Sequence, residues 1–476
     1  MLALASMLPS GPAGTPRVAL GVVPTDSDLL YVQPVEGLPS ATLAEVLARL
    51  GFAVEPSTHT TGVRVIVTAD APALAQRLAE TGLIRSVEGD ATVRATQVPT
   101  PVAAEGVAEG AEPPPLPDDP LFEEYQRAYL EAIGAPDAWA TGARGEGVVI
   151  AVIDTGIDFN HPDLISRLAL NFADRFFDRI DNDGNGCADD IVGCNFVSLS
   201  TADPSCGYTQ PPPHWLTLDD EGHGTFVSGV AAATGDNRVG ITGVAPRALI
   251  LPVKVLDCTA TGRISDAAAG IRYAADAGAD VINISFGTPN DSPALRDAVR
   301  YAQSRGAVVV ASAGNDGSSG ITSPAAYPGV LAVAASGSVV EALDRPNDYH
   351  RAASFAQFGL GVDFLAPGVD VLSTIPSRRC QAGTWTCVDE QYAVASGSSF
   401  ATPFVAGAVA VMLSAHPERS EAFLVNLLST VRDPALPGES GRLVDLGAAA
   451  TRPLFQAGVP DVSRDGGGRP PGPGVP

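Results

Sequence analysis

Apolar residues gather in short continuous runs along most of the chain, and polar or glycine-containing segments separate these runs. Three of them, at 148–153, 281–284 and 307–310, are rich in valine and isoleucine. Runs of this length and composition are typical of strands buried on both faces of a parallel sheet. A longer apolar stretch at 404–413 predicts a buried helix. These patterns predict an α/β fold with a mostly parallel central sheet.

Residues 18–95 show a different pattern, in which short strand-like runs alternate with two helical segments. Asp70 is a plausible N-cap of the second helix, because its side chain can accept a hydrogen bond from a backbone N–H of the first turn. A β-α-β-β-α-β order is typical of a ferredoxin-like sandwich. The predicted elements are strands at 18–23 or 29–35, 52–54, 63–67 and 84–93, and helices at 42–50 and 71–80.

Composition sets the boundaries of the other segments. Residues 96–117 are rich in Pro, Ala, Gly and Glu, which predicts a flexible, cleavable linker. A large domain at 118–455 follows, and the Gly- and Pro-rich segment 456–476 is expected to be disordered. Residues 1–17 are leader-like, with a short apolar run and small residues but no positively charged start. We expect no membrane span, because no run of about 18 apolar residues is present.

The chain is strongly acidic. It has 476 residues, of which 45% are hydrophobic, and this is enough for a large core. The net charge of −25 comes from 54 acidic and 29 basic residues. Such a surface argues against nucleic acid as a partner, because the phosphates would be repelled, and it is compatible with bound cations.

Six cysteines allow complete pairing in fifteen connectivities. Cys380 and Cys387 lie in one loop, so a disulfide between them could close it locally. The other four, Cys187, Cys194, Cys206 and Cys258, are spaced irregularly, unlike a zinc site. Disulfides would indicate an oxidising, extracytoplasmic setting, and reduced buried cysteines are the alternative.

Three polar residues stand where catalytic groups are expected. Asp154 directly follows the run 148–153, and functional residues of parallel sheets lie beyond the carboxyl ends of the strands. His223 opens the string H-G-T-F-V-S-G, and Ser399 lies in G-S-S-F-A-T-P before an apolar helix. A serine hydroxyl needs a base to accept its proton, and histidine has a suitable pKa. A buried aspartate can orient that histidine and stabilise its charged form.

Together the strings V-I-A-V-I-D-T-G-I-D (149–158), H-G-T-F-V-S-G (223–229) and G-S-S-F-A-T-P (397–403), in the order Asp, His, Ser, resemble the subtilisin-like serine peptidases (subtilase family, S8). A single Asp-Thr-Gly after a strand is more often structural than catalytic, but the combination is specific. The resemblance covers about residues 118–450. It implies a subtilisin-like three-layer fold and a serine-type endopeptidase. It also implies that the unit at 18–95 is an inhibitory propeptide, with an unrelated accessory module as the alternative.

The resemblance assigns further roles. Asn315, in A-S-A-G-N-D-G, corresponds to the asparagine of the oxyanion hole, where the Ser399 N–H would be the second donor. The segment V-I-N-I-S-F-G (281–287) resembles the segment whose main chain pairs with an extended substrate. The expected substrate-binding residues are Ser285, Phe286, Gly287, Ala313 and Gly314.

Two positions depart from the family pattern. The family usually has histidines where this chain has Phe226 and Phe404, on two helices that converge near the active site. The joint change suggests that an apolar contact replaces a polar one, as a structural adjustment rather than a loss of activity.

The segment D-N-D-G-N-G-C-A-D-D (181–190) crowds oxygen ligands into ten residues, as hard cations such as Ca²⁺ require. Gly186 falls where an EF-hand loop turns sharply, but position 12 would be Val192 rather than a glutamate. A solvated acidic turn is the alternative. The expected ligands of a structural Ca²⁺ are Asp181, Asp183, Asn185, Asp189 and Asp190.

The sequence thus predicts a secreted, calcium-stabilised serine endopeptidase, made as a self-processing zymogen that its own propeptide inhibits. We expect protein or peptide substrates, a monomer, and no organic cofactor. One alternative is a catalytically inactive fold that binds peptides. Another is a narrow maturation protease, for which Asp257, Asp266 and Asp291 lie in plausible loops but are not assigned to a pocket.

Overall fold

The computed structural model describes residues 19–22, 28–55, 62–67, 70–95, 116–175, 178–198, 200, 202–210, 212–337, 348–383, 385–417, 421–430 and 443–451. The expected leader, most of the expected linker and the C-terminal tail lie outside these residues. The chain divides into two compact units, Met1–Asp90 and Ala91–Pro476. The division falls five residues before the boundary expected at 95, so residues 91–95 belong with the large unit.

The smaller unit has the predicted ferredoxin-like order. Its described strands are β1 (Ala19–Leu20), β2 (Leu29–Pro34), β3 (Val63–Ile66) and β4 (Ile84–Gly89), in the sheet order β1-β4-β2-β3. β2 pairs antiparallel with both β3 and β4. The strand predicted at 52–54 is reduced to one antiparallel bridge between Val54 and Val65, at the edge where a ferredoxin-like sheet has its second strand.

Two helices cover this small sheet. They are α1 (Ser40–Arg49) and α2 (Ala71–Ala79), and the leucines at 43, 47 and 78 are fully buried among the strand valines. Asp70 caps α2 as predicted, because its carboxylate accepts the N–H of Ala73 at 2.8 Å. The spacing of apolar residues in this region therefore agrees with both helices and with the face that each helix buries.

The large unit is built on a parallel sheet. Among the described residues it has seven strands, in the order β13-β12-β11-β10-β6-β8-β7, and every pairing between neighbours is parallel. The apolar runs recognised in the sequence are its central strands, and their residues are almost entirely buried. The strands are β6 (Val149–Asp154), β7 (Cys194–Asn195), β8 (Leu249–Lys254), β10 (Val281–Ile284), β11 (Val308–Ser312), β12 (Leu331–Ser336) and β13 (Phe364–Pro367).

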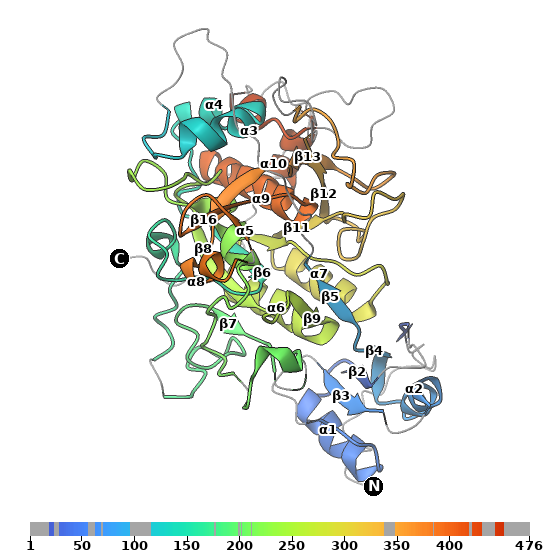
Figure 1. Ribbon diagram of the computed structural model, residues 1–476. Helices are drawn as coiled ribbons and strands as arrows, with labels where there is room; N and C mark the ends of the chain where they lie inside the picture. The colour runs from blue at the N-terminus through green and yellow to red at the C-terminus, as the bar shows by residue number, and fades with distance from the viewer. Residues whose placement is uncertain are drawn as a thin grey trace. The chain divides into compact units, whose positions relative to one another are not determined.

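Helices pack on the two faces of this sheet, which gives the expected three layers (Figure 1). On one face lie α5 (His223–Ala232) and α9 (Ser398–Ala415), which also pack against each other. α6 (Ile264–Asp276) and α7 (Pro293–Ser304) form the other layer. α5 begins with His223, and α9 begins with Ser398, the residue before Ser399. The first pair of helices therefore carries two of the expected catalytic residues.

α9 is apolar along its whole length. It has 18 residues, which is long and apolar enough to cross a membrane, and it alone meets that test among the described residues. However, 89% of it is buried inside the protein. The helix is therefore explained as the core helix behind Ser399, as its sequence predicts.

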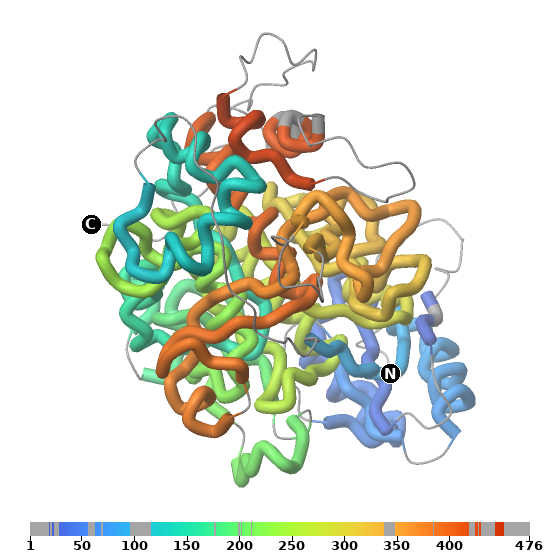
Figure 2. The backbone as a smooth tube through the Cα atoms, turned by 45° about the horizontal axis from the view of Figure 1, so that its top comes forward, coloured from blue at the N-terminus to red at the C-terminus, as the bar shows by residue number. Residues whose placement is uncertain are grey.

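Short elements complete the large unit. Figure 2 shows segments of distant sequence meeting: α11 (Leu446–Thr451) packs on α4 (Ala135–Ala140), where the N–H of Leu446 donates to the carbonyl oxygen of Ile133 at 2.8 Å. The remaining helices are the π-helix Phe122–Gln126, α3 (Arg127–Ala132), α8 (Ser377–Gln381), α10 (Glu421–Thr430) and the 3-10 turns Ile165–Arg167 and Pro204–Cys206. The remaining strands are β5 (Thr92–Arg94), β9 (Thr261–Arg263), β14 (Val371–Thr374), β15 (Thr386–Cys387) and β16 (Tyr392–Ala395).

All the cysteines lie within the described residues, and all of them are paired. The disulfides are Cys187–Cys194, Cys206–Cys258 and Cys380–Cys387. The local closure expected for the last pair is confirmed. The other two pairings are among the connectivities that spacing alone left open.

Candidate functional site

Asp154 is the last residue of β6, at the carboxyl end of the central sheet. It is fully buried, and its Oδ1 accepts the N–H of Thr155 at 2.7 Å. The same sheet edge carries Lys254, which stands opposite Asp154 in the register of β6 and β8. The position matches the general rule for functional residues of parallel sheets.

His223 begins α5, and its ring meets Asp154. The ring Nδ1 lies 2.9 Å from Oδ1 and 3.0 Å from Oδ2 of that carboxylate. Burial of the ring disfavours the imidazolium, but the charge and hydrogen bond of Asp154 outweigh it, and the pKa of His223 is raised above its ordinary value. The carboxylate therefore holds Nδ1 as the protonated nitrogen and leaves Nε2 to accept a proton.

Ser399 lies in the first turn of α9, and its side chain is almost completely buried. Its Oγ donates to the carbonyl oxygen of Ser285 at 2.7 Å, so in this rotamer it is not directed to the histidine. The Nε2 of His223 has no hydrogen-bond partner among the described residues. The two segments nevertheless adjoin, because the ring of Phe400 packs against that of His223 at 5.1 Å between centroids.

Asn315 lies just after β11, next to the start of α9. Its Oδ1 accepts the N–H of Ser398 at 2.8 Å. This contact connects the asparagine to the residue before Ser399, and it leaves the Nδ2 amide as the donating end of the side chain. The structure thus brings Asn315 beside Ser399.

A strand of the chain itself lies in the expected substrate position. β5 pairs antiparallel with β9, and Arg94 also forms an antiparallel bridge with Gly287. Arg94 and Gly287 exchange two main-chain hydrogen bonds of 3.3 Å. Val93 and Ala95 are buried, while Arg94 is exposed. Thr92–Ala95 therefore lies alongside the segment 285–287 as an added strand, with the side chains of Val93 and Ala95 turned towards the protein.

The other expected substrate-binding residues lie close to this segment or to Ser399. Ser285 Oγ donates to the carbonyl oxygen of Ser399 at 2.7 Å, and Phe286 is buried in the core. Gly314 donates its N–H to the Oγ of Ser398 at 3.3 Å and has a φ of +121°. An added Cβ at this glycine would collide with the side chain of Gln357.

Asp219 is an organising residue that the motifs did not reveal. Its fully buried carboxylate accepts hydrogen bonds from the side chain of Thr155, from the N–H groups of Glu221, Gly222 and Thr225, and from the Thr225 hydroxyl. Burial opposes ionisation, but the Lys254 charge and these donors outweigh it, so the pKa of Asp219 is lowered. An acidic residue shortly before a helix start was the only available sequence signal.

Lys254 is also enclosed near Asp154. Its side chain is 2% exposed, and Nζ donates to Asp220 Oδ1 at 2.7 Å, to the carbonyl oxygen of Leu256 at 3.0 Å and to that of Thr155 at 2.5 Å. The main chain of Thr155, directly after Asp154, is thus held by the buried amine of Lys254.

Phe226 and Phe404 do not form one shared pair. The ring of Phe226 packs on Phe400 at 4.4 Å and is stacked on Trp385 at 5.4 Å. The ring of Phe404 instead meets Tyr129 edge-on at 5.4 Å. Each phenylalanine fills its own aromatic cluster, so the two substitutions satisfy separate apolar contacts.

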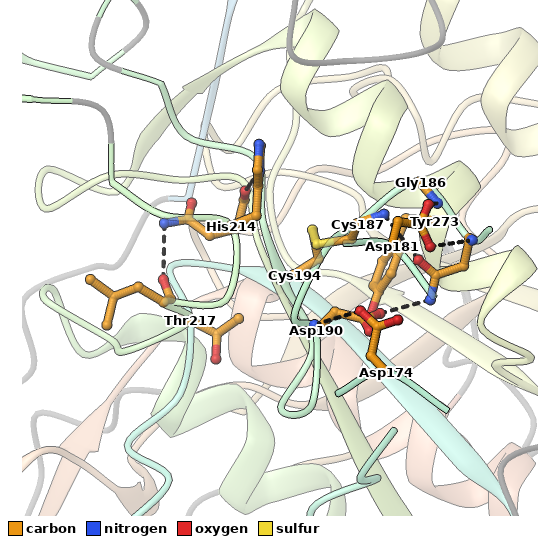
Figure 3. Close-up of a disulfide and its surroundings, with 12 residues drawn as sticks. Asp174, Asp181, Gly186, Cys187, Asp190, Cys194, His214, Thr217 and Tyr273 are labelled. Atoms are coloured by element: carbon orange, nitrogen blue, oxygen red, sulfur yellow. Dashed lines mark hydrogen bonds between the residues drawn. A yellow bond between two sulfur atoms is a disulfide. The ribbon is translucent and has the colours of Figure 1, made fainter. Parts of the chain in front are cut away.

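The acidic segment 181–190 folds into a loop beside the Cys187–Cys194 disulfide (Figure 3). Ligand-type oxygens of Asp174, Asp183 and Asp190 all lie within 4.8 Å of one another. Burial, with a smaller contribution from the charge of Asp183, raises the pKa of Asp190 to about 6. Tyr273 donates its hydroxyl to Asp190 Oδ2 at 2.6 Å.

The other expected ligands are placed differently around this group. Asp181 accepts the N–H groups of Gly184 and Gly186, and Asp189 accepts the N–H of Arg179. Asn185 donates its amide to Asp183 and Asp190. Asp174, which was not among the expected ligands, precedes the motif by seven residues, so the loop pattern alone did not include it.

Two other gatherings of ligand-type groups occur among the described residues. Cys187, Cys194 and His214 lie together, but the two cysteines are joined by a disulfide and cannot act as thiolate ligands. Asp118, Asp119 and Asp236 lie together at a turn, where Asp119 accepts the N–H of Asp236 at 3.0 Å.

The arrangement agrees with comparisons to known proteins. The model of the subtilase family matches residues 145–438. The chain is 38% identical over 298 residues to thermophilic serine proteinase of Bacillus sp. (strain AK1), which covers 63% of this chain and 60% of that protein. It is 37% identical to subtilisin NAT of Bacillus subtilis subsp. natto, over 64% of this chain and 66% of the relative. The chain thus spans less than two thirds of the length of these relatives.

Further comparisons agree. Thermitase of Thermoactinomyces vulgaris is 37% identical over 63% of this chain and 85% of its own length. Among solved structures, fervidolysin from Fervidobacterium pennivorans, a keratinolytic enzyme related to subtilisin, matches with a TM-score of 0.68 and 25% identity, over 92% of this chain and 63% of that one. With the family model matched across the whole sheet and all three motifs, the chain belongs to the subtilase family.

Proposed function

We propose that the protein is a serine endopeptidase that hydrolyses peptide bonds through Asp154, His223 and Ser399. The observation that carries this proposal is the buried His223–Asp154 contact of 2.9 Å beside the start of the helix that bears Ser399. The family relationship supports the same activity.

The residues divide the chemistry as follows. A rotation of the Ser399 side chain away from the carbonyl of Ser285 directs Oγ to Nε2 of His223. His223 accepts the hydroxyl proton while Oγ attacks the scissile carbonyl, and it then donates the proton to the leaving amine. Asp154 stabilises the imidazolium formed between these steps. A water molecule, activated by His223, hydrolyses the acyl-enzyme in the second half of the reaction.

The oxyanion is stabilised by two donors. The N–H of Ser399 belongs to the first turn of α9, where backbone N–H groups have no partner within the helix. The Nδ2 amide of Asn315 is the second donor, since its Oδ1 is engaged by Ser398. Both groups are fixed before the reaction, which is what makes such donors effective.

The N-terminal region acts as an inhibitor that the enzyme removes from itself. Support comes from Thr92–Ala95, which is paired with both β9 and Gly287 as an added strand. This strand leads directly into the expected linker 96–117, and Gly287 belongs to the same segment as Ser285, whose carbonyl oxygen is 2.7 Å from Ser399 Oγ. The first cut is therefore proposed within the linker.

The remaining features agree with an exported enzyme. Three disulfides are typical of proteins in oxidising compartments, and relatives of the chain are subtilisins. We therefore propose secretion of the protein.

A Ca²⁺ ion would be held by Asp174, Asp183 and Asp190. Their carboxylates converge, and the raised pKa of Asp190 shows that the cluster is costly to ionise without a compensating cation. When bound, the ion would stabilise the native state without entering the chemistry.

The catalytic proposal is tested with purified protein and its Ser399→Ala variant, through intact mass, N-terminal sequencing and labelling by a fluorophosphonate. We expect the wild type to be labelled, to lose its N-terminal region and to begin within residues 97–117. The variant should remain full length and unlabelled. Processing that persists in pure Ser399→Ala protein would refute the assignment of the nucleophile. A new N-terminus outside residues 97–117 would refute only the proposed position of the cut.

The calcium proposal is tested in the Ser399→Ala background, where self-digestion is absent. Addition of Ca²⁺ at 100 times its dissociation constant should stabilise the fold by about 2.7 kcal/mol, measured by thermal unfolding. The Asp190→Asn variant should lose most of this gain, while Asp291→Asn, an exposed aspartate elsewhere, should keep it. Equal gains in both variants would place the ion somewhere else.

A further inference from the structure

A loop closed by the Cys380–Cys387 disulfide contacts the segment that carries His223. We call residues 377–387 the disulfide loop; they comprise α8, of which Arg379 directly precedes the disulfide, together with Trp385 and β15. Neither the three motifs nor the proposed mechanism gives this loop a role. Trp385 is 7% exposed, which is unusual for a large aromatic residue in a short surface connection.

The loop makes two hydrogen bonds to a single backbone atom. Arg379 Nε donates to the carbonyl oxygen of Glu221 at 2.6 Å, and Trp385 Nε1 donates to the same oxygen at 3.3 Å. Glu221 lies two residues before His223, and its own carboxylate accepts the N–H of His223 at 2.8 Å. The loop thus fixes the peptide that leads into the first residue of α5.

Trp385 also reaches the residue one turn after His223. Its ring is stacked on Phe226 with centroids 5.4 Å apart and an interplanar angle of 22°. Phe226 packs on Phe400 at 4.4 Å, and Phe400 packs on the ring of His223 at 5.1 Å. The indole therefore supports the imidazole through a continuous row of rings, as well as through the backbone.

Gly222, between Glu221 and His223, shows how closely the loop approaches. It has a φ of +120°, and an added Cβ would lie 3.0 Å from Trp385 Nε1 and 3.0 Å from Cδ1 of Ile375. The backbone just before His223 is thus in direct contact with the loop. Only a glycine fits that conformation and that approach without strain.

The other end of the loop is joined to the nucleophile. β15 pairs antiparallel with β16, with Thr386 opposite Val394 and Cys387 opposite Ala393. β16 ends at Ala395, and the chain then passes through Gly397 to Ser399. One covalently closed loop therefore contacts the segments of both the base and the nucleophile.

We propose that Trp385 and Arg379 are positioning residues, which set the distance between His223 and Ser399, and that the Cys380–Cys387 disulfide holds them in place. This inference rests on the proposed function. The physical reason is that a displacement of about 1 Å in a catalytic pair can lower the rate roughly a hundredfold, so an added support near the base has a kinetic effect. The contacts of the disulfide loop given above are to the segment of His223 and to β16, and none of them is to Gly287.

The kinetic test compares Trp385→Ala, Trp385→Phe and Arg379→Ala on a peptide substrate. Trp385→Ala should lower kcat by about tenfold to a hundredfold with KM nearly unchanged. Trp385→Phe keeps an aromatic ring to stack on Phe226 and loses the N–H donor and part of the indole, so it should recover most of the activity. Arg379→Ala should also lower kcat rather than raise KM. A variant that unfolds at a lower temperature but keeps the wild-type kcat would overturn the proposal.

The disulfide has a matched control within the chain. Cys187–Cys194 has the same sequence separation of seven residues as Cys380–Cys387, so the two bonds restrict the unfolded chain equally. We expect the double variant Cys380→Ser/Cys387→Ser to lower kcat, and Cys187→Ser/Cys194→Ser to leave kcat within about twofold of the wild type. Equal losses of kcat in the two variants would assign the effect to general stability and overturn the proposal.

A second measurement does not depend on activity. In the Ser399→Ala protein, the Nδ1–H of His223 that faces Asp154 gives a proton resonance that NMR can follow with ¹⁵N-labelled histidine. Trp385→Ala should shift or broaden this resonance, and Trp385→Phe should restore it. If the wild type proved inactive, the proposed function would fail, yet the resonance would still decide whether the loop positions the ring. An unchanged resonance in Trp385→Ala would refute the positioning role.

Discussion

Glu221 is a buried carboxyl group only two residues from the proposed catalytic base. Burial, followed by the neighbouring charge of Asp219, raises its pKa from 4.5 to about 7, although His223 and Arg379 act in the opposite direction. A carboxyl group with a raised pKa binds its proton more tightly in the folded protein than in the unfolded chain. The fold therefore loses stability at this residue as the pH rises from about 4.5 to about 7.

Replacement of the Glu221 carboxyl group by an amide should remove this loss of stability at high pH. In Ser399→Ala protein, we expect Glu221→Gln to be more stable than its parent at pH 8, by an amount on the order of 2–3 kcal/mol, and to show a smaller fall in stability between pH 5 and 7. The glutamine oxygen can still accept the N–H of His223. Urea unfolding at several pH values measures the difference. A variant that is less stable than its parent at pH 8 would contradict the assigned direction of the pKa.

At this scale the sequence located the residues that we propose for the chemistry better than the residues that support them. Asp154, His223, Ser399 and Asn315 stand in motifs, because each must follow a strand end or begin a helix. Asp219 and Trp385 act through contacts between segments that are distant in sequence. No local sequence pattern predicts such contacts. Position in a motif is local information, whereas support from a distant loop is not.

The contact between α5 and α9 decides how closely the two catalytic helices approach. Gly407, in the middle of α9, faces the segment after α5: an added Cβ would lie 2.7 Å from Val244 Cβ and 3.1 Å from the carbonyl oxygen of Ala231. Alanine is favoured over glycine in a helix by about 1 kcal/mol, so propensity alone would predict stabilisation. The close contact instead predicts destabilisation. The β-branched side chain of Val244 has little rotamer freedom, and Val244 and Ala231 are both fully buried, so neither can move aside easily.

We therefore expect Gly407→Ala to destabilise the protein by about 1–3 kcal/mol in spite of its better helix propensity. The double variant Gly407→Ala/Val244→Ala makes room for the new methyl group and should recover part of the loss relative to the sum of the two single changes. Denaturant unfolding of the four proteins in the Ser399→Ala background gives the coupling. Additive effects would mean that the two positions do not meet.

Elements were predictable where one periodicity governs them. The central parallel strands β6, β10 and β11, both helices of the smaller unit and the apolar helix behind Ser399 all follow from runs of apolar residues. The short strand β5 was expected as the end of a longer strand at 84–93, but it separates from β4 and pairs with β9 instead. Its pairing partner lies more than 160 residues further along the chain, so its own sequence could not identify it.

Over the whole molecule, the net charge of −25 makes self-repulsion a global contribution to stability. Salt shortens the range of this repulsion, from roughly 30 Å at 0.01 M to about 3 Å at 1 M. In the absence of Ca²⁺, we expect NaCl to raise the Tm of the Ser399→Ala protein, by about 2–4 °C for each kcal/mol of repulsion that is screened. Sucrose of equal osmolality serves as the control. A Tm that falls with NaCl would show that ion pairs outweigh the repulsion.

Lys254 is the only lysine of the sequence, and its amine is enclosed by backbone carbonyls and Asp220. Amine-directed reagents such as activated esters should therefore find no reactive side-chain amine on the native protein. Apart from the proposed nucleophile Ser399, which an activated ester can also acylate, the α-amino group at the first residue is then the one amine open to acylation, whichever residue comes first. Each self-cleavage would create a new such site, so a fluorescent ester would both count the cuts and allow attachment of the enzyme to a support by a single, defined end.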